Sequence, residues 1–248
     1  MSENLKFPEK KRVYHGHEAV SGSRRPISVR SLAALAMALA VVASAEAQRS
    51  APWVGQSFSG VPCSGGRQGV GPLDYTSRSD RNSNLFDLIV EAHFYPEVEA
   101  LTGRNTFGDL DYTLRAIPNH HRALDAMMRY QLGSDNEHRQ YLLKRKIPPT
   151  ECYLYRAQNF APNDGKIDLL LGLLKHRLGD MEGALAVYKQ AESKGATSSE
   201  LYYNIGLLLI DMDRPKEAMR YARRAYSSGF PLRGLARKLE ARGMAIDF

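Results

Sequence analysis

The fold of this chain is decided by two stretches, DLLLGLLKHRLGDMEGALAVYKQAESKG at residues 168–195 and YYNIGLLLIDMDRPKEAMRYARRAYSSG at residues 202–229. The second repeats the first after 34 residues, so Gly172 matches Gly206 and Ala184 matches Ala218. The same offset relates Leu171 to Ile205, Leu185 to Met219 and Ala191 to Ala225. A fixed period of this length predicts helix–turn–helix units stacked side by side, because one unit cannot bury its apolar face alone.

The repeated unit resembles the tetratricopeptide repeat, in which paired helices cross closest at small residues. The matched glycines and alanines stand at those positions, and the turns carry Gly179-Asp180 in the first copy and Asp213-Arg214-Pro215 in the second. The resemblance implies an all-α, tetratricopeptide-type helix-turn-helix solenoid with an irregular N-terminal segment. An unrelated pair of helical hairpins is the alternative.

Three positions depart from the family pattern. Asp168 stands where a Trp-like residue is usual, Lys175 where Tyr is usual, and Ala222 where an aromatic residue is usual. Because period, small residues and turns agree in both copies, we expect two repeats within residues 163–248. A final helix over residues 232–242 would cap them.

Residues 1–47 have the order of a secretory signal peptide. A basic region leads into the apolar stretch SLAALAMALAVVA at 31–43, and Ala45-Glu46-Ala47 supplies small residues where a signal peptidase cuts. We expect export to the periplasm by the general secretory (Sec) route or, because Ser23-Arg24-Arg25 precedes a mild apolar core, by the twin-arginine route. An uncleaved N-terminal anchor is the alternative.

An oxidising compartment predicts a disulfide between Cys63 and Cys152, the two cysteines of the chain. The bond would join residues 48–82, rich in Gly, Ser and Pro, to the helices that follow. We expect residues 48–82 to form an irregular segment that packs on the helical array. The alternatives are a disordered linker and two separate buried thiols.

Residues 83–162 predict a helical region with one interrupted repeat. The first helix has Ser83 as its N-cap, and Pro96 begins or kinks the next turn, which continues to Gly103. Apolar spacing predicts further helices over 109–117, 120–132 and 151–160. Residues 133–150, which are charged and carry Pro148-Pro149 near their end, form the insertion.

The charge balance argues against nucleic acid as a partner. The chain has 34 Lys and Arg against 27 Asp and Glu, a net charge of +7. Residues 1–47 hold seven of the basic and four of the acidic residues, so the remainder carries a surplus of four. A nucleic-acid-binding protein usually concentrates its charge in a stripe, and we interpret a surplus of this size as solvated surface.

No set of residues assembles into a catalytic site. His120 and His121 adjoin, so on a helix their side chains point about 100° apart and do not easily serve one metal. Asp74, Asp109 and Asp111 stand in loops or near helix starts, where carboxylates cap unpaired amide groups. We therefore expect no enzyme activity, no metal and no cofactor.

The resemblance implies that the first helix of each repeat lines a concave groove for a partner. The residues assigned to partner binding are Arg122, Arg129, Lys166, Leu169, Leu173, Tyr203, Asn204 and Leu207. Family members that clamp an extended peptide often bond its backbone through an Asn at the position of Asn204, and the basic residues here would hold its carboxylates. The leucines equally favour an apolar helix or strand. The alternative is that they pack against the chain's own N-terminal segment.

These expectations describe a periplasmic, non-catalytic adaptor that captures a peptide or helix of a partner protein. Resembling proteins imply a role in assembly or maintenance of an envelope complex, with membrane contact only through that complex. An accessory subunit of a periplasmic enzyme or redox complex, co-exported with its partner, is the alternative function.

Overall fold

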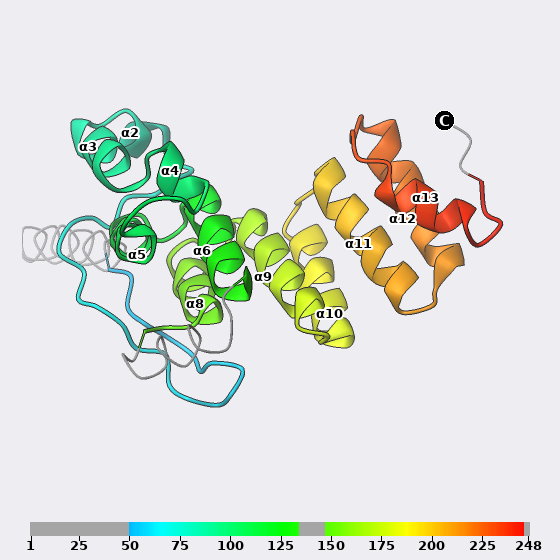
Figure 1. Ribbon diagram of the computed structural model, residues 1–248, viewed down its shortest axis with the longest axis horizontal. Coiled ribbons are helices and arrows are strands. Elements are labelled where there is room, and N and C mark those ends of the chain that lie inside the picture. Colours follow the sequence, from blue (N-terminus) through cyan, green and yellow to red (C-terminus); the bar gives the residue numbers. More distant parts are fainter. Residues whose placement is uncertain (1–49, 134–146, 246–248) are drawn as a thin grey trace, which may run out of the picture. The chain divides into compact units, whose positions relative to one another are not determined.

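The computed structural model describes residues 50–133 and 147–245, where every regular element beyond one isolated bridge is a helix (Figure 1). The helices are α2 (Arg78–Arg81), α3 (Asn84–His93), α4 (Pro96–Glu99), α5 (Thr106–Ala116), α6 (His121–Gly133), α8 (Thr150–Phe160), α9 (Gly165–Arg177), α10 (Met181–Ser193), α11 (Ser199–Asp211), α12 (Pro215–Ser227) and α13 (Gly234–Glu240). The all-α prediction is confirmed. The expected signal peptide at 1–47 and most of the insertion at 133–150 lie outside the described residues.

Helices α9 to α12 form two hairpins, with α9 packed on α10 and α11 packed on α12. The first turn ends at Gly179, whose φ of +85° lies in the left-handed region that glycine adopts without strain. Asp180 then caps α10, because its carboxylate accepts a hydrogen bond from the Gly183 amide at 3.0 Å. The second turn has Asp213 at φ 55° and Pro215 at the start of α12. Both turns therefore follow from their residue types.

The matched glycines meet different neighbours in the two hairpins. A Cβ at Gly172 would clash with the ring of Tyr188 on α10, so a small residue is required where these helices cross. Ala222 stands at the position of Tyr188 in the second copy and has no ring to contact Gly206. A Cβ at Gly206 would instead clash with Leu235 of α13. The helix after the second hairpin therefore fills the place of the missing aromatic ring.

Asp168, at the Trp-like position, is fully buried. Its Oδ2 lies 2.7 Å from Nζ of Lys194, and its Oδ1 accepts a hydrogen bond from Gln158 at 2.6 Å. A buried carboxylate is tolerated only when it is paired in this way. An ion pair therefore replaces the usual aromatic contact here.

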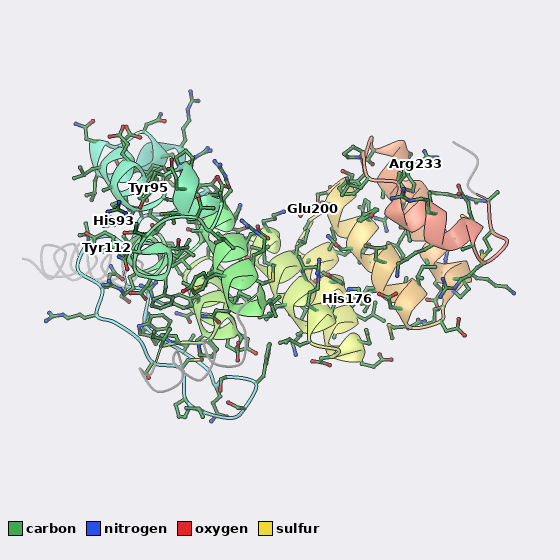
Figure 2. All side chains as sticks on the ribbon, viewed as in Figure 1. His93, Tyr95, Tyr112, His176, Glu200 and Arg233 are labelled. Atoms are coloured by element: carbon green, nitrogen blue, oxygen red, sulfur yellow. A yellow bond between two sulfur atoms is a disulfide. The ribbon has the colours of Figure 1, made fainter. Side chains whose placement is uncertain are left out.

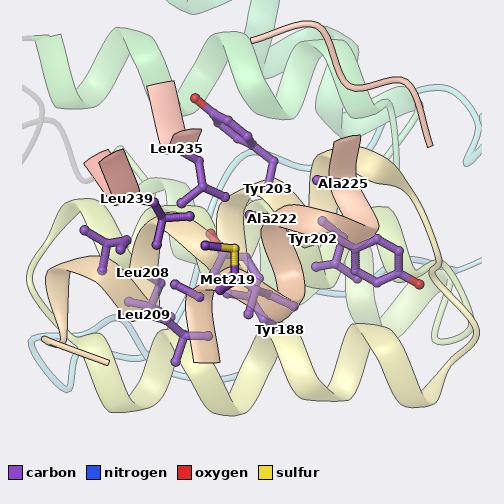
Figure 3. Close-up of a cluster of buried hydrophobic side chains, with 14 of the residues drawn as sticks. Tyr188, Tyr202, Tyr203, Leu208, Leu209, Met219, Ala222, Ala225, Leu235 and Leu239 are labelled. Atoms are coloured by element: carbon purple, nitrogen blue, oxygen red, sulfur yellow. The ribbon is translucent and has the colours of Figure 1, made fainter. Parts of the chain in front are cut away.

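Helix α9 belongs to two apolar clusters. Leu169 packs with α10 to α13, where Tyr188, Met219 and Leu235 gather (Figure 3). Leu170 and its neighbours pack instead with α4, α5, α6, α8 and the end of α3. Because α9 buries side chains on both sides, it joins the preceding helices to the repeated hairpins.

Residues 50–77 contain no helix and are held against α5 and α8 by two strong contacts. Cys63 and Cys152 form a disulfide, which confirms that prediction. One turn further along α8, the buried Arg156 donates hydrogen bonds to the carbonyl oxygens of Ala51, Leu114 and Arg115 and to Oε1 of Gln68.

Some predicted boundaries differ from the structure. Residues 48–82 contain the one-turn helix α2, started by Ser77, whose hydroxyl accepts a hydrogen bond from the Asp80 amide. Pro96 begins a new turn, α4, as one of the two predicted possibilities had it, but that turn ends at Glu99 rather than Gly103. Helix α5 begins at Thr106 rather than Asp109, and α13 is shorter than residues 232–242. None of the helices in the described part is long and apolar enough to span a membrane.

Overpacking the hairpins is expected to destabilise them. Gly172→Val and Ala184→Trp should each lower the free energy of unfolding by about 1–3 kcal/mol, because the added atoms have no space beside Tyr188 or in the core. Urea unfolding followed by circular dichroism measures the change. Ala186→Trp, on the exposed side of α10, is the matched control. An equal loss in the Ala186 variant would contradict this explanation.

Removing the disulfide is expected to lower the free energy of unfolding by more than either of these substitutions. The bonded cysteines are 89 residues apart, and the chain-entropy model assigns about 4–5 kcal/mol to a loop of that length. The Cys63→Ala/Cys152→Ala variant should therefore unfold at lower urea concentration, and the wild type should shift equally after reduction. A reduced wild type that keeps its full stability would show that the bond contributes little.

Candidate functional site

The exposed side of α9 and α11 is the part of the structure that corresponds to the predicted groove lining. We call it the first-helix face and define it by Lys166, Leu173, His176, Glu200, Asn204, Leu207 and Asp211, all of which are at least partly exposed. These residues lie along one stripe of each helix. Equivalent positions are 34 residues apart, so Leu173 on α9 corresponds to Leu207 on α11.

An ion pair and a histidine–carboxylate contact join α9 to α11 near the ends of this face. Lys166 pairs with Glu200, and Nε2 of His176 lies 3.0 Å from Oδ2 of Asp211; Figure 2 labels His176 and Glu200. Nζ of Lys238 on α13 lies 2.9 Å from the other Asp211 oxygen. Burial alone would raise the pKa of Asp211, but hydrogen bonds from Lys238 and His176 outweigh burial and hold that pKa below its ordinary value.

Leu173 and Leu207 lie between these two contacts along their helices, and both are half-buried. Because the contacts connect α9 and α11 on either side of the leucines, the two side chains occupy equivalent places at the centre of the face. The first-helix face therefore has an apolar centre and polar ends whose charges are already matched.

Leu169 and Tyr203 were also assigned to partner binding, but the structure places them in the core. Their exposed fractions are 1% and 8%, and the Tyr203 ring lies 4.4 Å from the ring of Phe230 between centroids. Helices α9 and α11 have neighbours on both sides, which cover these two positions. Neither side chain is presented on the first-helix face.

Arg122 and Arg129 remain on the surface but bond within the chain. Arg122 forms a bidentate pair with Glu99 and lies over the ring of Phe94, 5.8 Å from its centroid. The hydrogen bond to Glu99 raises the pKa of Arg122 above its ordinary value. Nε of Arg129 donates to Asp125 at 2.8 Å, and its NH2 donates to the Glu99 carbonyl at 3.0 Å. Their role as a carboxylate clamp stays a prediction.

Asn204 and Lys166 also bond to other residues of the chain. The amide nitrogen of Asn204 donates to the carbonyl of Glu200, one turn earlier on α11, at 3.0 Å. The Lys166 ammonium pairs with the side chain of that same Glu200. A peptide that bonded Asn204 and Lys166 would therefore have to replace contacts that α9 and α11 already make.

The chain's own N-terminal segment lies elsewhere. Phe58 packs edge-on against Tyr155 of α8, with Nζ of Lys175 4.8 Å from its ring centroid, and the Phe58 amide donates to Glu151 at 3.0 Å. The hydrogen bonds, ring contacts and disulfide that residues 50–77 make with later parts of the chain include α2, α3, α5, α6, α8, Asn119 and Lys175, but not Leu173 or Leu207. The described part of the segment therefore does not support the self-occupied alternative.

A hollow that the sequence analysis missed lies between α10, α11 and α12. Its volume is ≈ 300 Å³, and it is lined by Leu185, Lys189, Leu209, Arg214, Glu217, Arg220, Tyr221 and Arg224. Most of these residues come from the second helices of the hairpins, which the family resemblance does not assign to a partner. The signal that would have found it is the dense Lys and Arg spacing along residues 214–224.

Two of the acidic residues expected to cap helices have other partners. Asp74 does cap its turn, since it accepts a hydrogen bond from the Thr76 amide at 2.8 Å. Asp109 instead lies 3.0 Å from Nδ1 of His93, which stacks on Tyr112 with a centroid separation of 4.0 Å (Figure 2).

Asp111 is the second acidic residue that binds other side chains instead of capping a helix. It accepts hydrogen bonds from Arg115 at 2.9 Å and from the Tyr153 hydroxyl at 2.7 Å, so it joins α5 to α8. Within residues 50–133 and 147–245, no group of three or more His, Cys, Asp or Glu side chains is arranged to hold a metal ion.

His120 bonds to the backbone at the start of α6. It is 2% exposed, and its Nδ1 accepts a hydrogen bond from the Ala123 amide at 3.2 Å, in the manner of an N-cap for α6. Burial, with a smaller contribution from the neighbouring His121, lowers the pKa of His120 to about 3. The imidazole is therefore neutral at neutral pH, as its acceptor role requires.

Comparison with known proteins adds one finding. A family model described as "Tetratricopeptide repeat" matches residues 199–228, which contain α11, the turn and α12. No curated protein and no solved structure matches the chain. The chain therefore contains a tetratricopeptide repeat, a unit that generally binds protein partners and is typically non-catalytic.

The neutral state of His120 predicts a loss of stability in mild acid. The unfolded chain takes up a proton near pH 6.5, whereas the folded chain resists it down to about pH 3, so stability falls as pH drops below 6.5. The expected loss is about 2 kcal/mol by pH 5, which urea unfolding at a series of pH values measures.

His120→Asn is the comparison variant, because its side-chain oxygen can accept the Ala123 hydrogen bond but does not titrate. Its stability should change less between pH 7 and pH 5 than that of the wild type. Identical pH profiles would rule out His120 as the cause.

Proposed function

We propose that this chain, which contains a tetratricopeptide repeat, is a non-catalytic adaptor that binds a segment of a partner protein on the first-helix face. The apolar centre formed by Leu173 and Leu207 is the observation that carries the proposal. Two half-exposed leucines at equivalent places on neighbouring helices give a partner side chain apolar surface to cover.

The paired side chains at the ends of the face favour an apolar segment over a charged tail. Lys166 and His176 already face Glu200 and Asp211, so an incoming carboxylate would gain little there unless it displaced an existing pair. An amphipathic helix or a strand with an apolar stripe meets no such cost. We therefore propose that the two leucines provide most of the binding affinity and that the polar ends of the first-helix face orient the bound segment.

We propose further that the adaptor acts in the periplasm after export, in assembly or maintenance of an envelope complex. The disulfide between Cys63 and Cys152 supports an oxidising location, because such bonds are rare in reducing compartments. The role in an envelope complex rests on the family resemblance alone.

Site-specific photo-crosslinking in cells tests the binding face. A photoreactive amino acid at Leu207 or Leu173 should give covalent adducts with a partner, whereas one at Leu178, which is 52% exposed at the end of α9, should not. Adducts are read by mass on denaturing gels and mapped by mass spectrometry.

Leu173→Asp/Leu207→Asp should abolish capture without loss of helicity, because both side chains are half-exposed. Arg122→Glu/Arg129→Glu is the second arm, and weaker capture in that variant would extend the site to α6. Equal adducts at positions 178 and 207, or unchanged capture by the leucine variant, would remove the first-helix face from consideration.

A further inference from the structure

The positive charge of this chain is concentrated at its C-terminal end. Residues 214–242 contain nine Lys and Arg but only two acidic residues, Glu217 and Glu240. Residues 48–213 contain 18 basic and 20 acidic residues, a slight negative balance. The surplus that we interpreted as dispersed surface charge therefore lies on α12, α13 and their connections.

Helix α12 presents part of this charge as one exposed stripe. Lys216, Arg220 and Arg223 follow the i, i+4, i+7 spacing and lie opposite the buried face of α12. Arg220 is 75% exposed in its side chain and lies 3.9 Å from Glu217, while Lys216 and Arg223 form no ion pair with any residue in the described ranges. Lys216 also stands in the first turn of α12, where a cation opposes the helix dipole. The stripe therefore adds nothing evident to the stability of the helix.

The hollow between α10, α11 and α12 borders this stripe, since Arg220 belongs to both. Leu185 and Leu209 contribute apolar surface to the hollow, while its basic side chains come from Lys189, Arg214, Arg220 and Arg224. Glu217 pairs with Arg214, and Glu192 pairs with Lys189 and Arg224. A mostly polar hollow that has leucine in its lining and a surplus of positive charge fits a leucine side chain with carboxylates beside it.

The same chain carries such a group on α3. Leu88 is 64% exposed and Leu85 is 37% exposed, and Asp87 and Glu91 lie on the same outward side of the helix. Residues 84–99 include four acidic residues and no Lys or Arg. Helix α3 packs on α2 and α5, whereas α12 packs on α11 and α13, so each surface faces away from its own neighbours.

We propose that two copies of this chain associate head to tail, with α3 of one copy docked on α12 of the next. Leu88 enters the hollow lined by Leu185 and Leu209, and Asp87 and Glu91 pair with the α12 stripe. Each copy carries one α3 surface and one α12 surface, so a contact made once leaves one surface of each kind free, and further copies extend the array into a chain or ring. This contact does not involve the first-helix face. The experiments on self-association and on partner capture therefore test separate surfaces, and either proposal can be wrong while the other holds.

Sedimentation velocity of the purified protein over a range of concentrations and salt tests the proposal. The wild type should self-associate as concentration rises, and salt should weaken the association because exposed charges are screened. Lys216→Glu/Arg220→Glu/Arg223→Glu should weaken it at least about tenfold by placing acidic α12 against acidic α3. Asp87→Lys/Glu91→Lys should do the same by making both surfaces basic.

The decisive experiment is sedimentation of a mixture of the α12 charge-reversal variant and the α3 charge-reversal variant. Each then offers the other a complementary surface, so association should return in the mixture although neither variant associates alone. Arg67→Glu/Arg104→Glu/Arg177→Glu, at exposed positions outside both surfaces, matches the charge change and should associate like the wild type. Leu88→Ser should weaken association even at low salt.

Several results would overturn the proposal: a wild type that stays monomeric at every concentration, association that neither reversal alters, or a mixture that stays apart. Vesicles containing phosphatidylglycerol provide the remaining test. Binding to them that is lost on reversal of the α12 charges, without self-association of the wild type, would assign the basic stripe to an anionic membrane instead.

Discussion

The buried guanidinium of Arg156 determines how the irregular part of this chain lies on the helical part. Its N–H groups donate hydrogen bonds to the end of α5 and to Ala51 and Gln68 of the N-terminal segment. Its Cζ lies 5.3 Å from the ring centroid of Trp53. Burial lowers the pKa of Arg156 to about 10, still high enough to keep the group charged at neutral pH. Every acceptor is therefore needed, because an unpaired buried donor of a charged group is costly. Cys152 stands one turn earlier on α8, so a covalent bond and a charged hydrogen-bond cluster act from the same helix.

The helical hairpins were predictable from the sequence, whereas the contacts that complete them were not. The 34-residue offset and the turn residues depend on local spacing, which a sequence displays directly. The pairing of Asp168 with Lys194 and the insertion of Leu235 beside Gly206 depend on which helices become neighbours. No periodicity within a single helix carries that information.

The same limit applies to the candidate site. Helical spacing correctly placed Leu173 and Leu207 on an exposed side, but it assigned Leu169 and Tyr203 to that side as well. These positions are about 60° away around the helix from Lys166 and Glu200, and the flanking helices cover them. The net charge of the chain did not show where the charge lies, for a related reason. It is a sum over all residues, so it does not distinguish the first-helix face, where acidic and basic side chains are paired, from α12, where basic side chains are in excess.

Leu235 also covers one side of the second hairpin. By occupying the space above Gly206, it covers the surface on which the first helix of another unit would otherwise stack. Each hairpin contacts chiefly its sequence neighbours, so this terminating contact is local to α11, α12 and α13. A further helix that stacked directly on α11 at this place would therefore have to displace Leu235 from Gly206.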